Sequence, residues 1–191
     1  MMTITTPISP AVQRAAEVLH EIHNAIERDS GVKATLKRTL TGEPRHQRAA
    51  YPIILRYLSD QRAQYQLEQW LWVTGFLAYY PQDINPKSKL TFGDSARQLK
   101  TEDGSKGPER RFRSLLETSL EDLRSPLTAM VRLMRSSKKK VVISYPQLLV
   151  DLNRWEHPDQ YIQDKWARAF WNAPTPPDNA PATDSSDLVD A

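Results

Sequence analysis

The chain has 191 residues, and its 26 Lys and Arg exceed its 23 Asp and Glu by three. It contains no cysteine, which excludes disulfides, thiolate metal sites and cysteine nucleophiles. Because no run approaches the ~18 apolar residues of a membrane span, and residues 1–10 lack the regions of a signal peptide, the sequence predicts a cytoplasmic protein with no membrane partner.

The N-terminal region has the spacing of amphipathic helices. Ser9 followed by Pro10 is typical of a helix start, and apolar residues then recur at helical spacing to about Asp29. We expect Gly31 to break this helix. A second, shorter helix should follow and end before Gly42.

The middle of the chain predicts two further helices and a connection. One helix should cover about 45–58, with a kink at Pro52. Residues 65–79 are dense in large apolar side chains, which indicates a central buried helix. Residues 81–107 are punctuated by Gly and Pro, and only a short helix is expected there, at about 94–99.

The last third again shows helical spacing. We expect two helices that are separated near Ser125 and Pro126, followed by a turn at residues 138–140. Ser144 should cap the next helix, and Pro158 should open the last one. Strand signals are nearly absent from the sequence.

These elements predict an all-α fold of two small helical bundles. The N-terminal bundle is expected in residues 1–80 and the C-terminal bundle in 108–171, joined by the long connection 81–107. Residues 172–191 are acidic, rich in proline and without periodicity, so this tail should be disordered.

Motifs of catalysis are missing from the sequence. His20 and His23 are three residues apart, whereas the zinc-protease helix needs histidines four apart. No phosphate-binding loop, nucleophile elbow or nuclease-type His-Asp dyad is present. We therefore expect no enzyme, no catalytic residue, no cofactor and no metal site.

The five tryptophans allow two interpretations. They could stack on nucleic-acid bases, or they could fill the core. Core packing is favoured because most of them fall on or near apolar helix stripes, at Trp70, Trp72, Trp155, Trp166 and Trp171.

Positive charge is concentrated in two stretches. Residues 31–62 hold seven Lys or Arg against two acids, and residues 106–140 hold ten against four. Without the four aspartates of the tail, 26 basic residues face 19 acids, a balance of +7. A basic folded part suggests a polyanionic partner, although a solvated face with internal ion pairs would give the same composition.

Helical geometry turns many of these basic side chains away from the core. At about 100 degrees per residue, the three basic residues of the second expected helix lie roughly 60 to 200 degrees around its axis from the apolar Leu36. Basic residues of the later helices face away from the apolar rows that contain Phe112 and Met130. The candidate nucleic-acid-binding residues are Lys33, Lys37, Arg38, Arg110, Arg113, Arg132 and Arg135.

Six segments carry a resemblance to a known family. They are Gly31–Arg38, Trp72–Pro81, Phe92–Ser95, Arg110–Leu116, Leu148–Trp155 and Trp166–Trp171. In this order they resemble the small subunit of the type I-E CRISPR Cascade complex, often called CasB. The resemblance covers about Gly31 to Trp171 and leaves out the tail.

The resemblance implies a non-catalytic subunit that helps keep the R-loop open by cradling the displaced DNA strand. The implied partners are the backbone and large subunits, a second copy of this subunit, guide RNA and target DNA. In the family, basic residues at the end of the first segment line the DNA path, which corresponds to Lys37 and Arg38. This sequence has Lys37 where the family often has Arg, so the charge is kept but a bidentate phosphate contact is not.

Two other functions compete with this one. The chain could be an architectural subunit whose basic face binds acidic protein surfaces, or a helix-turn-helix regulator. The second is disfavoured because no helix combines a tight turn with a clear recognition face.

Overall fold

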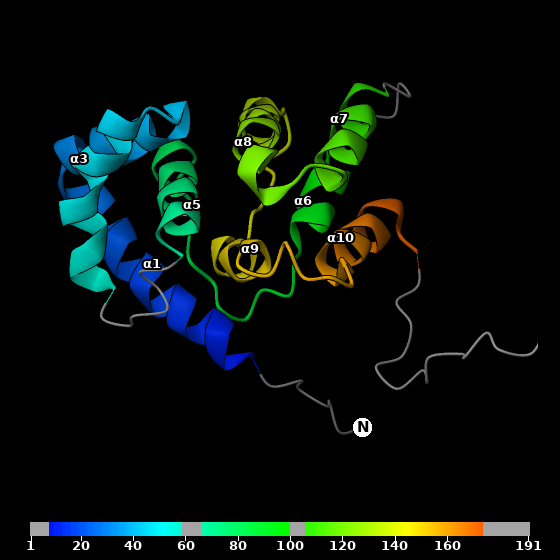
Figure 1. Ribbon diagram of the computed structural model, residues 1–191, viewed down its shortest axis with the longest axis horizontal. Helices are drawn as coiled ribbons and strands as arrows, with labels where there is room; N and C mark the ends of the chain where they lie inside the picture. The colour runs from blue at the N-terminus through cyan, green and yellow to red at the C-terminus, as the bar shows by residue number, and fades with distance from the viewer. Residues whose placement is uncertain (1–7, 59–65, 100–105, 174–191) are drawn as a thin grey trace, which may run out of the picture.

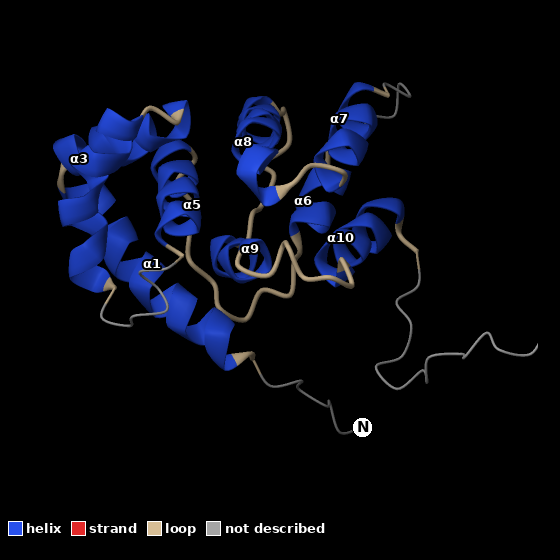
Figure 2. Ribbon diagram, viewed as in Figure 1, coloured by secondary structure: helices blue, strands red, loops and turns tan. Residues whose placement is uncertain are grey.

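The computed structural model describes residues 8–58, 66–99 and 106–173. In these ranges every regular element is helical (Figure 2), which confirms the predicted all-α class. None of the helices described is both long and apolar enough to cross a bilayer. The predicted tail lies almost entirely outside these ranges.

The helices pack around one continuous core, with α5 and α9 near the middle of the molecule (Figure 1). In chain order the elements are α1 (Pro10–Arg28), α2 (Ser30–Arg38), the 3-10 turn η1 (Thr39–Thr41), α3 (Pro44–Ile54), the 3-10 turn η2 (Leu55–Tyr57), α5 (Leu67–Tyr79), α6 (Phe92–Arg97), α7 (Gly107–Leu116), α8 (Leu120–Ser136), α9 (Tyr145–Leu152) and α10 (Tyr161–Trp171).

The first helix ends at about Asp29, as predicted, but Asp29 itself separates α1 from α2, so the prediction that Gly31 breaks the helix was wrong. The Asp29 carboxylate accepts hydrogen bonds from the backbone N–H of Gly31 at 2.7 Å and of Val32 at 3.3 Å. This N-cap satisfies donors that a new helix leaves free. Gly31 therefore sits inside the first turn of α2.

The break between α7 and α8 also differs from the prediction. Pro126 lies inside α8, and the chain turns earlier, where Ser119 is in an extended conformation before the helix. The indole N–H of Trp155 donates to the carbonyl of Thr118 at 2.9 Å and holds this turn. A proline inside a helix costs a backbone hydrogen bond, but the buried stripe of α8 continues through it.

The last helix begins three residues later than predicted. Pro158 lies in a turn that is closed by the Gln160 N–H donating to the His157 carbonyl at 2.9 Å. Gln160 has a φ of 48°, in the left-handed region. That conformation cannot continue a helix, so α10 starts at Tyr161.

Helix α5 is the predicted central helix, and each residue from Gln69 to Ala78 is buried. Helix α2 and η1 lie against it. The Thr39 hydroxyl lies 2.7 Å from the Leu36 carbonyl and 2.9 Å from the Leu71 carbonyl. Gly75 permits this approach, because a Cβ there would lie 2.6 Å from Thr39 Oγ1.

Helix α9, in the C-terminal half of the chain, packs on both α1 and α5 of the N-terminal half. The Tyr145 hydroxyl donates to the Tyr80 carbonyl at 2.7 Å. Burial, with a smaller contribution from Tyr80, raises the pKa of the Tyr145 phenol well above its usual range, so it keeps this proton. The core is continuous across both halves, and the boundaries at residues 81 and 108 stay a prediction.

A buried carboxylate joins α9 to α10. Asp151 is 1% exposed and accepts hydrogen bonds from the Trp166 indole at 2.7 Å, Lys165 Nζ at 2.6 Å and the Gln147 amide at 2.8 Å. Buried charges are stable only when they are paired and hydrogen-bonded. The three donors meet that requirement, and the two on α10, Lys165 and Trp166, fix that helix against α9.

Helices α6 and α10 cross at Gly93. A Cβ at this position would lie 2.1 Å from the carbonyl oxygen of Trp166, which is backbone and cannot move aside. We expect Gly93→Ala to lower the free energy of unfolding by about 1–3 kcal/mol, the usual cost of overpacking. Denaturant unfolding of the purified chain measures this loss.

The control is Gly31→Ala, whose added Cβ would meet only the end of the Asp29 side chain, at 3.0 Å. Its effect should be smaller, because a side-chain end need move by only a few tenths of an ångström, which can keep the cap, and alanine favours a helix. Equal stability of wild type and Gly93→Ala would show that the two helices do not cross as closely as described.

Candidate nucleic-acid interface

Four of the five tryptophans are core residues, as predicted. Trp70, Trp72, Trp155 and Trp166 are each at most 5% exposed, whereas Trp171 is 37% exposed. The buried four have no free face on which a base could stack. Any contact with nucleic acid must therefore use other side chains, and the basic residues are the first candidates.

Helix α2 presents the first group of predicted residues. Leu36 is fully buried, and this turns Lys37 and Arg38 outward into exposed positions. Lys33 is half-buried and lies 3.8 Å from Glu27. Lys37 and Arg38 form no ion pair within the described ranges, so they are the more available cations of α2.

The Tyr79 ring, at the C-terminal end of α5, brings the two basic stretches together. Lys37 Nζ from α2 lies 5.7 Å from the ring centroid, and Arg135 Cζ from α8 lies 4.4 Å from it. Both distances are in the range of cation–π attraction. Residues that are far apart in the sequence thus form one site, which we call the Tyr79 cluster: Lys37, Tyr79 and Arg135.

Helix α8 extends this cluster. Arg132 is exposed and precedes Arg135 by three residues, which places both on one side of the helix. Arg124, earlier on α8, donates to the Leu40 carbonyl at 2.9 Å. That bond anchors α8 on η1 and so helps to keep Arg135 beside α2.

Helix α7 holds the remaining predicted residues, and α8 lies between it and α5 (Figure 1). Arg110 is exposed. Arg113 lies 3.3 Å from Glu109 and 5.7 Å from the Trp171 ring centroid. The contacts of Arg113 are therefore with α7 and α10, and the structure does not bring it into the Tyr79 cluster.

Comparison with known families decides where this fold belongs. The model of the family described as CRISPR-associated protein Cse2 matches residues 32–171, which is most of the chain. The chain belongs to the Cse2 family. This confirms the resemblance of the six segments to the Cascade small subunit.

A Cse2 protein of Thermus thermophilus is 34% identical over 70 residues, which are 37% of this chain and 38% of that relative. The aligned part thus spans well under half of the relative's length. A solved Cse2-family structure from the same organism has a TM-score of 0.67 and 24% identity, over 83% of this chain and 98% of the other.

Two further structures share the Cse2 fold. CasB of M. ruber has a TM-score of 0.60 and 24% identity, over 80% of this chain and 93% of that one. A chain of a CRISPR RNA-guided surveillance complex has a TM-score of 0.69 and 20% identity, over 85% and 94%. At these identities the likeness shows a common architecture.

Several residues in the six segments that carry the resemblance are packing residues. Gly93 permits the crossing of α6 and α10, Asp151 receives the indole of Trp166, and Leu36 anchors α2 in the core. Burial of Leu36 in turn leaves Lys37 and Arg38 exposed on α2. Tyr79 was not among the predicted site residues, although it lies within the segment Trp72–Pro81 that carries the resemblance.

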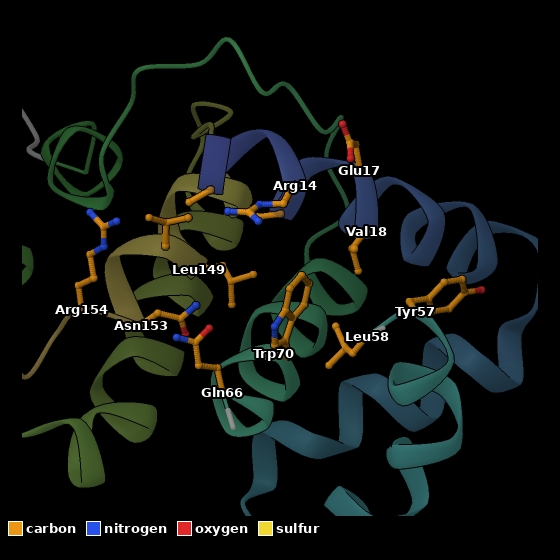
Figure 3. Close-up of a pocket in the computed structure, with 13 residues that line it drawn as sticks. Arg14, Glu17, Val18, Tyr57, Leu58, Gln66, Trp70, Leu149, Asn153 and Arg154 are labelled. Atoms are coloured by element: carbon orange, nitrogen blue, oxygen red, sulfur yellow. The ribbon is translucent and has the colours of Figure 1, made fainter. Parts of the chain in front are cut away.

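A cavity of about 580 Å³ lies elsewhere in this Cse2-family fold, between α1, η2, α5 and α9 (Figure 3). Trp70 and Asn153 line it, and the buried Trp70 Nε1 and Asn153 Oδ1 have no hydrogen-bond partner within the described ranges. Its lining includes Arg14 and Arg154 but none of the seven predicted residues. Over the same ranges no three His, Asp or Glu side chains gather as metal ligands.

Proposed function

We propose that this chain is a non-catalytic subunit of a CRISPR RNA-guided surveillance complex and that it stabilises the R-loop by contacting the displaced DNA strand. Membership of the Cse2 family supports the assembly, as does the shared fold with a chain of such a complex. Its partners would be the backbone and large subunits, a second copy of this chain, guide RNA and target DNA.

The Tyr79 cluster is the observation that carries the proposal. Exposed cations from α2 and from α8 meet there, with Arg38 and Arg132 beside them in the sequence. Lys and Arg contacts to phosphates give affinity without reading sequence. Such a surface suits the displaced strand, because pairing of the other DNA strand with the guide RNA already selects the target sequence.

The seven predicted residues should not contribute equally. Lys37, Arg38, Arg132 and Arg135 form the centre of the proposed interface. Lys33 and Arg113 have acidic neighbours, Glu27 and Glu109, which a DNA phosphate would have to replace, so their contributions should be smaller. Arg110 is exposed on α7 and would extend the path along that helix.

Assembly with and without this subunit provides the test. We expect the complete complex to release labelled target DNA more slowly than a complex that lacks the subunit, and added subunit should restore slow release. The reason is that the subunit supplies phosphate contacts that the other components lack. Equal release rates, with assembly impaired, would favour the architectural alternative.

A further inference from the structure

We infer that Tyr79 is a positioning residue that holds Lys37 and Arg135 together as a two-cation cradle for neighbouring phosphates of one DNA strand. The inference rests on the proposed function and adds to it a residue without charge. Tyr79 would act through the two cations and would not read a base.

The geometry shows why the two cations need the ring. Lys37 and Arg135 carry like charges and come from helices that belong to opposite halves of the chain. Both cations lie over the Tyr79 ring, at 5.7 and 4.4 Å from its centroid. The negative face of an aromatic ring attracts cations, and this attraction offsets their mutual repulsion.

The ring is itself firmly placed. Tyr79 is the last residue of α5, which is buried from Gln69 to Ala78, and the next residue, Tyr80, accepts a hydrogen bond from Tyr145 at 2.7 Å. Tyr79 packs partly buried against the core. Because the fixed ring already restrains the long side chains of Lys37 and Arg135, they have less conformational entropy to lose when DNA binds.

The test compares assembled complexes by the rate at which they release labelled target DNA. Tyr79→Leu removes the aromatic face and should speed release about two- to fivefold. This is the fold-change that corresponds to the free energy of one exposed cation–π contact. Tyr79→Phe keeps the face and should behave as wild type. Tyr79→Gln gives a second variant without a ring in case Tyr79→Leu assembles poorly.

The Lys37→Ala/Arg135→Ala background separates positioning from direct stacking. If Tyr79 acts through the two cations, adding Tyr79→Leu to this background should change release no further. An undiminished effect there would mean that the ring contacts DNA itself, and a Tyr79→Phe complex as weak as Tyr79→Leu would also overturn the positioning role.

The same set of complexes distinguishes this inference from the proposed function. A Tyr79→Leu complex that equals wild type, beside a weakened Lys37→Ala/Arg135→Ala complex, would overturn the positioning role alone. Wild-type release from the Lys37→Ala/Arg135→Ala complex would overturn the proposed DNA contact, and the inference with it.

Discussion

Replacing Asp151 by Ala should lower the free energy of unfolding by about 3 kcal/mol. The carboxylate is 1% exposed and accepts bonds from the Trp166 indole, Lys165 and Gln147. Hydrogen bonds to a charged group are each worth about 1.5–3 kcal/mol, and a buried donor without a partner is costly. Removing one partner of a buried charged pair usually costs about 3–5 kcal/mol in total. The side chain of Lys165 is 36% exposed and can turn toward water, so we expect a loss at the low end of that range.

Thermal unfolding measures this effect. For a chain of this size, about 3 kcal/mol corresponds to a fall in Tm of roughly 6–12 °C. Glu156→Ala is the matched control, because Glu156 is an exposed acid in the turn that follows α9, and such changes usually stay within about 0.5 kcal/mol. If Asp151→Ala melts at the same temperature as Glu156→Ala, the buried network does not hold α10.

The helices were largely predictable because their apolar stripes are strong. The stripe of α1 and the dense apolar run of α5 both became buried faces. The errors concern turns, where single residues decide. Pro126 is tolerated inside α8, and Asp29 caps α2 through a side chain that the apolar pattern does not register.

The site was predictable in part. The sequence shows that Lys37 and Arg38 face away from Leu36, because this follows from helical geometry alone. It does not show that Lys37 and Arg135 meet on Tyr79, because that depends on how α2, α5 and α8 pack. Arg124, likewise, donates to a backbone carbonyl of η1 that no periodicity identifies.

Replacing Lys37, Arg38, Arg132 and Arg135 together by Ala should strongly destabilise the open DNA state of the assembled complex. Exposed ion pairs are each worth up to about 1 kcal/mol, so four lost contacts should weaken DNA binding by about 2–4 kcal/mol, roughly thirtyfold or more. Guide loading and the Tm of the isolated subunit should change little, because all four side chains are exposed.

The control for this variant is the substitution of exposed cations outside the proposed interface, Arg45→Ala/Arg56→Ala. Arg45 lies 2.7 Å from Glu43, and Arg56 donates to the Pro52 carbonyl. Their loss should leave DNA release unchanged. A loss of DNA binding as large as that of the four-residue variant would mean that overall charge, and not this surface, is responsible.

The most direct test of the account is the salt dependence of target DNA release from complexes with wild-type or Lys37→Ala/Arg38→Ala subunit. Each lost contact with a single-strand phosphate should lower the slope of log affinity against log salt by about 0.7. The account predicts a slope lower by about 1.4 for the double variant, with the same loss for every target sequence. Unchanged affinity and slope, together with impaired assembly, would contradict DNA contact and leave an architectural subunit.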